Sequence, residues 1–573
     1  MEGRLTGTAG ERKATAYVAS VFEQLGLEPG GDDGSYFQSF DFTAGVRLGD
    51  ENRLTIVSGQ AREDGVLDED WRPLAFSTVG ETAGSGVVFA GYGITAPGTG
   101  EVPDYDSYEG LDVAGKWVMV LRFQPESVPP EWRRHLIHYS DLPYKASVAR
   151  RNGAAGIIVV TGPDAQARDR LVDLRFEAGA ADAGIAGVAL SDAKAAELLG
   201  TAGRDLKTLQ GRLDKGESVE GFELPDDVML SARIGILSEQ RNGRNVLAWL
   251  RARPSSDEPP VILGAHVDHL GRGETPGSLA VDAERGAIHY GADDNASGVA
   301  AMLEAAQYLA GLAGEGELGA VRDIGFAAWS GEELGTLGSS HYVEALAQDG
   351  GLEGRVAAYV NMDMVGHVGE KVFVQGTGSS SAWPREIERR NVPVGLPLTL
   401  QPDPYLPTDT TPFYVKGVPV LNLFTGAHED YSSPRDTPDR LDYDGVRDVA
   451  RLAAGLVRSV ARAPRAPGHV EVERRQSGLA RKHLRAYLGT IPAYGQDESV
   501  QGVQLQGAVK GGPADEAGVV GGDVVVELAG VEVRTIHDYM GALSGLKVGE
   551  ETDLVVLRDG KPERLRVVPG ARE

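Results

Sequence analysis

The fold class follows from two segments, PVILGAHVDHLG (260–271) and GADDNASGVAAMLEAAQYLAGL (291–312). The first is a short apolar run that ends in polar residues, which is typical of a buried strand. The second places apolar residues at helical spacing after an acidic turn. A strand followed by an amphipathic helix predicts an α/β unit.

Similar apolar runs continue on both sides of this pair. They are NVLAWL (245–250), DIGFAAWSGEE (323–333), AAYVNMDMVG (357–366) and VPVLNLF (418–424). Alternation of such runs with helical patterns predicts a doubly wound, mostly parallel sheet. Ligands of such sheets bind beyond the carboxyl ends of the strands, so the polar residues that follow each run are the first candidates for a site.

The residue pattern of the sequence changes at four places, and these changes predict three structural units. The α/β unit takes residues 1–83 and 236–463, and a β-rich insert with Gly and acidic turns takes 84–235. Pro464, Pro467 and Gly468 mark a linker over 464–474. Short strand patterns around GGPADEAG (511–518) predict a small β domain over 475–573.

Composition excludes several classes of protein. The 573 residues carry a formal charge of -28, and such a surface repels phosphate backbones, so no nucleic-acid partner is expected. The chain has no Cys, which excludes disulfides, thiol catalysis and Cys-type zinc sites. No run approaches 18 apolar residues, so no membrane span is expected, and the first residues lack the apolar core of a signal peptide.

Acidic residues and histidines gather at the ends of the predicted strands. A set of His and carboxylates suits Zn²⁺ or another borderline divalent ion, and a carboxylate between two ions can bridge them. In the adjacent pair Glu332-Glu333, one side chain can hold a metal while the other takes a proton from water. The candidates are His266, Asp268, His269, Asp293, Asp294, Glu332, Glu333, Asp363 and His428.

Each candidate has an ordinary structural explanation when taken alone. Asp293-Asp294 can cap a helix, and Glu332-Glu333 can be a solvated surface pair. The joint pattern, with an acid or a His at each strand end of one unit, favours a metal site. The remaining histidines lack such company and are expected to be structural or exposed: His135, His138, His289, His341, His367, His469, His483 and His537.

The motifs AHVDHLG, GADDNASG, SGEELGTLGS and NMDMVG resemble the di-zinc aminopeptidase family that also contains glutamate carboxypeptidase II and the glutaminyl cyclases. The N-terminal residues also look like that family's opening helix. The insert looks like a protease-associated domain. The C-terminal unit resembles a PDZ domain, which implies a carboxylate-binding loop at Tyr487, Leu488, Gly489 and Thr490.

The resemblance implies a role for each matching position. His266 and Asp363 would hold the first zinc, Asp294 would bridge two zinc ions, and Glu333 would hold the second. Glu332 would be the general base and Asp268 would orient His266.

One departure concerns the last ligand, a His that in the family precedes an Asp-Thr pair by four residues. Here that Asp is Asp436, and the ligand position holds Ser432. Thr410 also stands where many relatives carry a His. Three hypotheses remain open: His428 completes the second site, the second metal is held weakly by Asp294, Glu333 and water, or the protein only binds peptides.

The resemblance implies a metal-dependent exopeptidase acting on peptides or proteins, foremost an aminopeptidase with a zinc-activated water. The alternatives are a carboxypeptidase of the same family and a catalytically weakened scaffold that binds peptides through the PDZ and protease-associated domains. Family habit implies a periplasmic or secreted protein, and a cytoplasmic one is not excluded.

Overall fold

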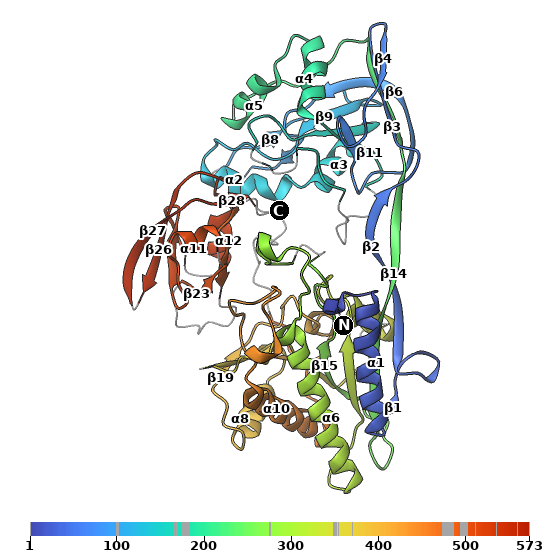
Figure 1. Ribbon diagram of the computed structural model, residues 1–573, viewed down its shortest axis with the longest axis vertical. Helices are drawn as coiled ribbons and strands as arrows, with labels where there is room; N and C mark the ends of the chain where they lie inside the picture. Colours follow the sequence, from blue (N-terminus) through green and yellow to red (C-terminus); the bar gives the residue numbers. More distant parts are fainter. Residues whose placement is uncertain are drawn as a thin grey trace.

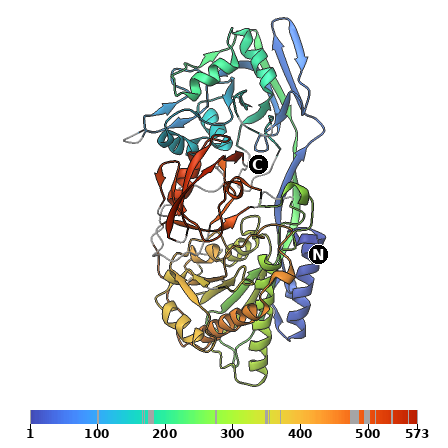
Figure 2. The same cartoon turned by 60° about the vertical axis from the view of Figure 1, so that its left-hand side comes forward.

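The computed structural model describes residues 2–98, 102–165, 167, 170–174, 183–273, 277–347, 352, 354–369, 371–472, 486–492, 502–509, 511–533, 536–558 and 560–571. Figure 1 shows two large units, one above the other, and a smaller β-rich unit beside them. In Figure 2 the smaller unit lies between the two large ones. Among the described residues, no helix has the length and apolar character needed to cross a bilayer.

The lower unit is built on a mixed nine-stranded sheet, with strand order β1-β14-β16-β15-β17-β20-β18-β19 and β2 paired to β14. The centre of the sheet is parallel, whereas β1, β2 and β14 join antiparallel and β18 pairs antiparallel with β20. The predicted α/β class is therefore confirmed, with more antiparallel pairing than expected. The strands are β1 (Glu28–Pro29), β2 (Phe37–Leu48), β14 (Ile236–Leu250), β15 (Val261–His266), β16 (Ile324–Trp329), β17 (Ala358–Met362), β18 (Val372–Gln375), β19 (Leu398–Gln401) and β20 (Val420–Phe424).

Helices cover both faces of this sheet because alternate side chains of its central strands point to opposite sides. On β15, Val261, Leu263 and Ala265 pack with α1, α6, α8 and α10, whereas Ile262 packs with α7 and α9. The two apolar clusters make a three-layer unit. The helices are α1 (Ala9–Gln24), α6 (Gly298–Gly314), α7 (Leu337–Leu346), α8 (Trp383–Asn391), α9 (Thr410–Tyr414) and α10 (Tyr443–Arg462).

The upper unit, the insert, has its own nine-stranded sheet, with order β4-β3-β13-β6-β9-β10-β11-β5 and β12 on β6. Its first strand begins at Arg53, so the sheet pairing starts the insert well before the expected residue 84, which falls inside β6. The elements are β3 (Arg53–Ser58), β4 (Ala61–Asp64), β5 (Trp71–Pro73), β6 (Gly80–Phe89), β7 (Thr95–Ala96), β8 (Tyr105–Asp106), β9 (Trp117–Leu121), α2 (Pro130–Leu136), α3 (Leu142–Arg151), β10 (Gly156–Val160), β11 (Ala186–Leu190), α4 (Asp192–Thr201), α5 (Leu206–Asp214), β12 (Phe222–Glu223) and β13 (Val228–Ile234).

The paired strands β2 and β14 join the insert to the lower unit, and Figure 1 shows them running between the two. The chain passes from β13 to β14 through Gly235 alone, and from β2 to β3 through residues 49–52. Asn52 fastens this crossing, because its amide donates to the carbonyls of Gly49 and Gly235 and accepts from the Gly235 N–H.

The C-terminal unit has a sheet of order β22-β23-β24-β26-β27, with β22 at its edge in the described part of the chain. Its Val509 packs against Met364, Phe424 and Ala427 of the lower unit. Arg133 of α2 donates to the carbonyl of Leu546, which ties the same unit to the insert. The elements are β21 (Ala486–Tyr487), β22 (Thr490–Pro492), β23 (Val503–Ala508), α11 (Pro513–Glu516), β24 (Val524–Leu528), β25 (Val531–Glu532), α12 (Ile536–Ser544), β26 (Thr552–Arg558), β27 (Lys561–Val567) and β28 (Gly570–Ala571).

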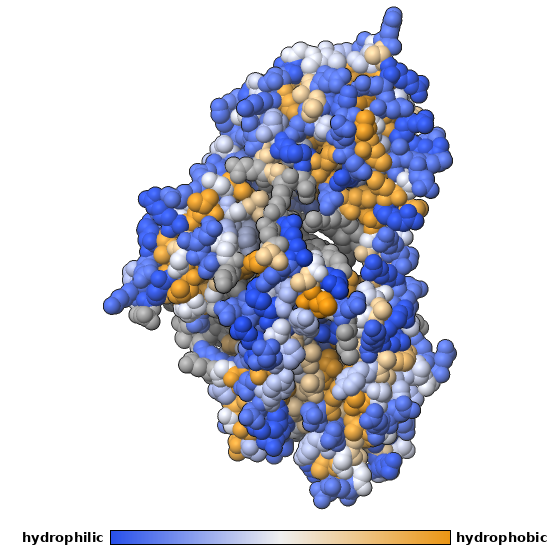
Figure 3. All heavy atoms as spheres, viewed as in Figure 1, coloured by the Kyte–Doolittle hydropathy of each residue, from blue (hydrophilic) through white to orange (hydrophobic). Residues whose placement is uncertain are grey.

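The surface on the face of Figure 3 is mostly hydrophilic, with smaller apolar groups, and it is hollowed between the insert and the lower unit. The strongly acidic composition agrees with this surface.

Candidate metal centre

The candidate residues meet at one edge of the lower sheet because three neighbouring strands end there. His266 is the last residue of β15, Asp363 directly follows β17, and Glu332 and Glu333 follow β16. Since β16, β15 and β17 are parallel neighbours, their carboxyl ends lie side by side. Asp294 reaches the same place from the turn before α6.

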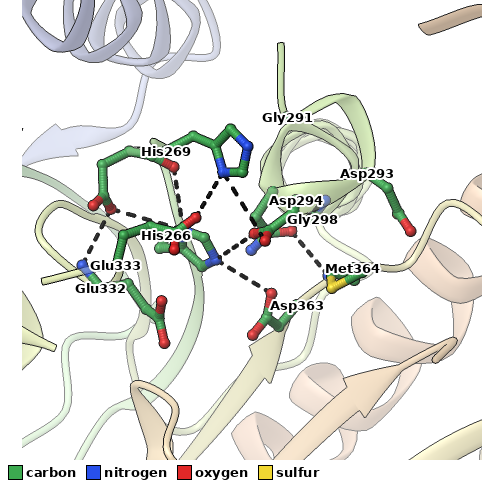
Figure 4. A network of polar contacts seen from close by, with 12 residues as sticks. His266, His269, Gly291, Asp293, Asp294, Gly298, Glu332, Glu333, Asp363 and Met364 are labelled. Carbon is green, nitrogen blue, oxygen red and sulfur yellow. Dashed lines mark hydrogen bonds and ion pairs between the residues drawn. The ribbon is translucent and has the colours of Figure 1, made fainter. Parts of the chain in front are cut away.

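His266, Asp294 and Asp363 form a first group. His266 Nε2 lies 3.3 Å from Asp294 Oδ1 and 3.2 Å from Asp363 Oδ1. Figure 4 shows the carboxylates of Asp294 and Asp363 on the same side of the His266 ring, each joined to this nitrogen by a dashed line. On the other side of the imidazole, Nδ1 lies 3.3 Å from the backbone carbonyl oxygen of Asp268 and 3.7 Å from Asp268 Oδ1.

His269, Asp294 and Glu333 form a second group. His269 Nδ1 lies 2.6 Å from Glu333 Oε1 and 3.9 Å from Asp294 Oδ2. Asp294 thus offers one carboxylate oxygen to each group, as expected of a bridging residue. Sequence reasoning noted His269 at a strand end without assigning it to the site. The signal was its place three residues after His266, just beyond the end of β15.

The hypothesis that His428 completes the second group does not agree with the structure. His428 Nε2 lies 3.4 Å from Asp293 Oδ2, and His428 belongs with Asp293 and His367. Asp293 and Asp294 are adjacent, but their side chains point in different directions in Figure 4. His428 therefore lies with Asp293, outside the group that contains Glu333. Ser432 is buried and belongs to none of these groups of potential ligands.

Glu332 precedes Glu333 in the turn after β16, and its carboxyl has a raised pKa. Burial raises the pKa of its carboxyl well above the ordinary value, and the neighbouring Asp363, Asp409 and Glu333 raise it further. Its backbone N–H donates to Asp268 Oδ1 over 3.2 Å. Asp268 therefore touches both the ring of His266 and the turn that carries Glu332, which fixes their relative position.

The electrostatics of the two groups fit a divalent cation. Burial raises the pKa values of Glu333 and Asp363, and the nearby carboxylates add to the effect. Burial also lowers the pKa of His269 to about 4, so that its imidazole is neutral near pH 7 and has a lone pair for a metal. One His and two carboxylates in each group are a donor set that Zn²⁺ accepts. The side chains of the two groups therefore fit zinc ions.

Two residues near the N-terminus, Arg4 and Thr6, form hydrogen bonds to segments of the site that are far away in the sequence. The Arg4 guanidinium is buried and donates to the backbone carbonyls of Val267, Tyr290 and Gly291 over 2.8, 2.6 and 2.9 Å, and to that of Asp294 over 3.4 Å.

Thr6 Oγ1 donates to Asp268 Oδ2 over 3.0 Å. Sequence reasoning missed both residues, because nothing in the opening helix pattern indicates a partner more than 250 positions away.

Two further residues lock the turn that carries Asp294. The carboxylate of Asp436 accepts from the backbone N–H groups of Asp293 and Asp294 over 2.9 to 3.0 Å. Asn295 donates to the Met362 carbonyl at the end of β17. The turn is thereby held against the strand that leads to Asp363.

Asp409 is a buried acid close to the site that the sequence did not indicate. Burial raises its pKa to about 7. Its Oδ1 accepts from Ser339 Oγ over 2.5 Å, while its Oδ2 is buried and has no hydrogen-bond partner among the described residues. The neighbouring Thr410 is buried in α9.

The loop expected to bind a peptide carboxylate lies at the edge of the C-terminal unit. Tyr487 ends β21, Leu488 is buried, Gly489 has a φ of +73°, and Thr490 begins the edge strand β22. The Gly489 carbonyl accepts from the N–H of Val509, the residue that packs on the lower unit.

Comparison with protein families matches two segments. Residues 245–457 match peptidase family M28, and residues 481–568 match the PDZ domain family. The predicted family resemblance is confirmed for these two segments.

Curated relatives are similar over part of the chain. An aminopeptidase of Pseudomonas aeruginosa is 28% identical over 216 residues, which are 35% of this chain and 34% of the relative. A probable lipoprotein aminopeptidase, LpqL, of Mycobacterium tuberculosis is 29% identical over 241 residues, 42% of this chain and 39% of the relative. The matched region spans about a third of the length of these relatives.

Solved structures with a similar course of the chain include an aminopeptidase from Aneurinibacillus sp. strain AM-1, with 20% identity, a TM-score of 0.47 and coverage of 82% of this chain and 93% of that one. A zinc aminopeptidase from Bacillus subtilis has 19% identity, a TM-score of 0.43 and coverage of 82% and 94%.

Proposed function

We propose, for a chain whose residues 245–457 match peptidase family M28, that the protein is a zinc aminopeptidase that hydrolyses the first peptide bond of its substrate. The observation that carries the proposal is the pair of ligand groups that share Asp294, with Glu332 beside them. The curated relatives named aminopeptidase support the same activity.

His266, Asp294 and Asp363 would hold one zinc ion, and His269, Asp294 and Glu333 a second. When bound, zinc supplies a Lewis acid for the scissile carbonyl and lowers the pKa of a water molecule. We assign the second nitrogen ligand to His269 in place of His428, because His269 touches Glu333 and His428 touches Asp293.

Glu332 would move the proton. A general base that works near neutral pH needs a pKa raised toward 7, and burial among carboxylates shifts the pKa of Glu332 in that direction. The same carboxyl group can return the proton to the leaving amine. Asp268 would hold the ring of His266 and the backbone of Glu332 at a fixed relative position during this transfer.

The acidic surroundings favour a free α-amino group over a terminal carboxylate. Arg4, the arginine that lies against this centre, uses its donors on backbone carbonyls and is not directed at a substrate. A carboxypeptidase needs a cation that receives the substrate's carboxylate. The aminopeptidase therefore fits these residues better than the carboxypeptidase.

The insert and the C-terminal unit would bind parts of the substrate away from the scissile bond. The insert would act as a protease-associated domain. The loop from Tyr487 to Thr490 would take a peptide carboxylate and add the peptide alongside β22, which is the edge strand in the described part of this sheet. The likeness to a lipoprotein aminopeptidase supports an envelope or extracellular place of action.

The test compares Glu332→Gln with the matched control Glu344→Gln, whose side chain is exposed on α7. The substrates are an amino-acid p-nitroanilide with a free amine, its N-acetylated form, and an N-acetylated peptide with a free carboxylate. We expect hydrolysis of the first substrate only, loss of activity with a chelator, and a 10²- to 10⁴-fold lower kcat in Glu332→Gln, about the contribution of a general base. Full activity of Glu332→Gln, or preference for the acetylated substrate, would refute the proposal.

A further inference from the structure

Asp293 is fully buried, and its two carboxylate oxygens have different surroundings. Oδ1 accepts from the backbone N–H of Gly366 over 2.6 Å and from Ser297 Oγ over 2.9 Å. Oδ2 instead faces two imidazoles, with His367 Nδ1 at 2.9 Å and His428 Nε2 at 3.4 Å. Figure 4 shows the Asp293 side chain directed away from the group around His266.

The two imidazoles lie against each other and point to the same oxygen. Their ring centroids are 4.0 Å apart and the ring planes make an angle of 22°. A hydrogen bond from His367 satisfies Oδ2, but His428 Nε2 is buried and has no hydrogen-bond partner in the part of the chain that the structure describes.

The spacing of these atoms suits a transition-metal ion. Zinc bonds of about 2.0–2.2 Å in tetrahedral geometry put neighbouring ligand atoms roughly 3.3 Å apart, close to the 2.9 and 3.4 Å found here. Two imidazoles with one carboxylate suit first-row divalent ions, whereas Ca²⁺ and Mg²⁺ prefer oxygen ligands. The side chains of His367 and His428 are 29% and 13% exposed, which leaves solvent access for an ion and for water ligands.

We infer that Asp293, His367 and His428 form a third metal site, which binds a first-row transition-metal dication such as Zn²⁺ separately from the two groups around Asp294.

An ion in this site would clamp three segments that build the neighbouring centre. Asp293 is adjacent to Asp294, and His367 follows Asp363 by four residues. His428 precedes Asp436, whose carboxylate accepts from the backbone of Asp293 and Asp294. The ion would therefore fix the turn before α6 against the loops that follow β17 and β20.

The experiment counts zinc in the full chain. Protein stripped with a chelator is titrated with Zn²⁺ against a chromogenic competitor, and bound zinc per chain is measured for wild type, His367→Gln and His341→Gln. The glutamine at 367 retains an N–H donor for Asp293 and removes the imidazole ligand. His341 is a partly buried histidine outside the three groups of potential ligands, and it serves as the matched control. We expect His367→Gln to bind one zinc fewer than wild type and His341→Gln to bind the same number.

A second pair of variants separates this site from the proposed active centre. His428→Gln repeats the test from the other imidazole, which covers the case that His367→Gln does not fold. His266→Ala should lose zinc from the active centre, and the double variant His266→Ala, His367→Gln should lose one zinc more. Equal zinc binding by wild type, His367→Gln and His428→Gln would overturn the third site and leave an ion pair, whereas the loss in His266→Ala would still support the proposed function.

Discussion

Replacement of Arg4 by Met tests whether the N-terminal segment holds the metal centre together. Methionine keeps much of the volume of the side chain and removes its donors. The carbonyls of Val267, Tyr290 and Gly291 then lose partners at 2.6 to 2.9 Å. An unpaired buried acceptor costs about 1–3 kcal/mol, and the lower end applies here because the variant also avoids burying a cation.

Three such losses predict a destabilisation of about 3 kcal/mol. A change of 1 kcal/mol shifts Tm by about 2–4 °C in a unit of 150–250 residues, so we expect a decrease of about 6–12 °C. The Asp294 turn and the loop of His269 would also lose their common anchor. We therefore expect zinc affinity to fall about 10- to 100-fold, as when residues behind metal ligands are replaced.

Differential scanning calorimetry of the metal-free full chain measures the first effect, and a competitive zinc titration measures the second. Arg12→Met is the matched control, because Arg12 is exposed on α1 and lies close to Arg4 in sequence. If Arg4→Met melts within 2 °C of Arg12→Met and binds zinc as tightly, the reasoning about the buried guanidinium is wrong.

Two further predictions concern the same centre. His269→Ala should bind one zinc fewer than wild type in the competitive titration, because it removes the nitrogen beside Glu333; an unchanged zinc content would disprove this assignment. Asp409→Asn should stabilise the metal-free protein increasingly between pH 4 and pH 7. The pKa of Asp409 is about 7 in the folded state and about 3.9 in the unfolded chain. Between these two values the native state retains a proton that the unfolded chain releases. The contribution of Asp409 to wild-type stability therefore becomes less favourable as pH rises. A difference in Tm between Asp409→Asn and wild type that stays constant from pH 4.5 to pH 7.5 would contradict this account.

The sequence allowed the prediction of the residues that depend on strand ends. His266, Glu332, Glu333 and Asp363 each follow an apolar run, and parallel pairing brings such ends together whatever the loops do. The place before a helix made both Asp293 and Asp294 candidates, and only the family resemblance singled out Asp294.

Residues placed by loops or by distant segments were not predictable in this way. The proposed choice of His269 over His428 rests on side-chain contacts, because His269 lies against Glu333 and His428 against Asp293. Arg4 acts through backbone carbonyls, which carry no sequence signal. The start of the insert was set too late because the strands after Arg53 have the same alternating pattern as those before it, and only their pairing partners separate the two sheets.

The ribbon of β2 and β14 determines how the insert can move over the metal centre. Its eleven paired positions extend for about 36 Å at the usual rise of a strand. A hydrogen-bonded ribbon of this length resists bending along its whole course, unlike a single-chain tether, and its compliant point is the crossing at Gly49 and Gly235 that Asn52 fastens. The insert is thus held by two hydrogen-bonded strands in place of a single chain, and this double support restricts how far it can tilt relative to the metal centre.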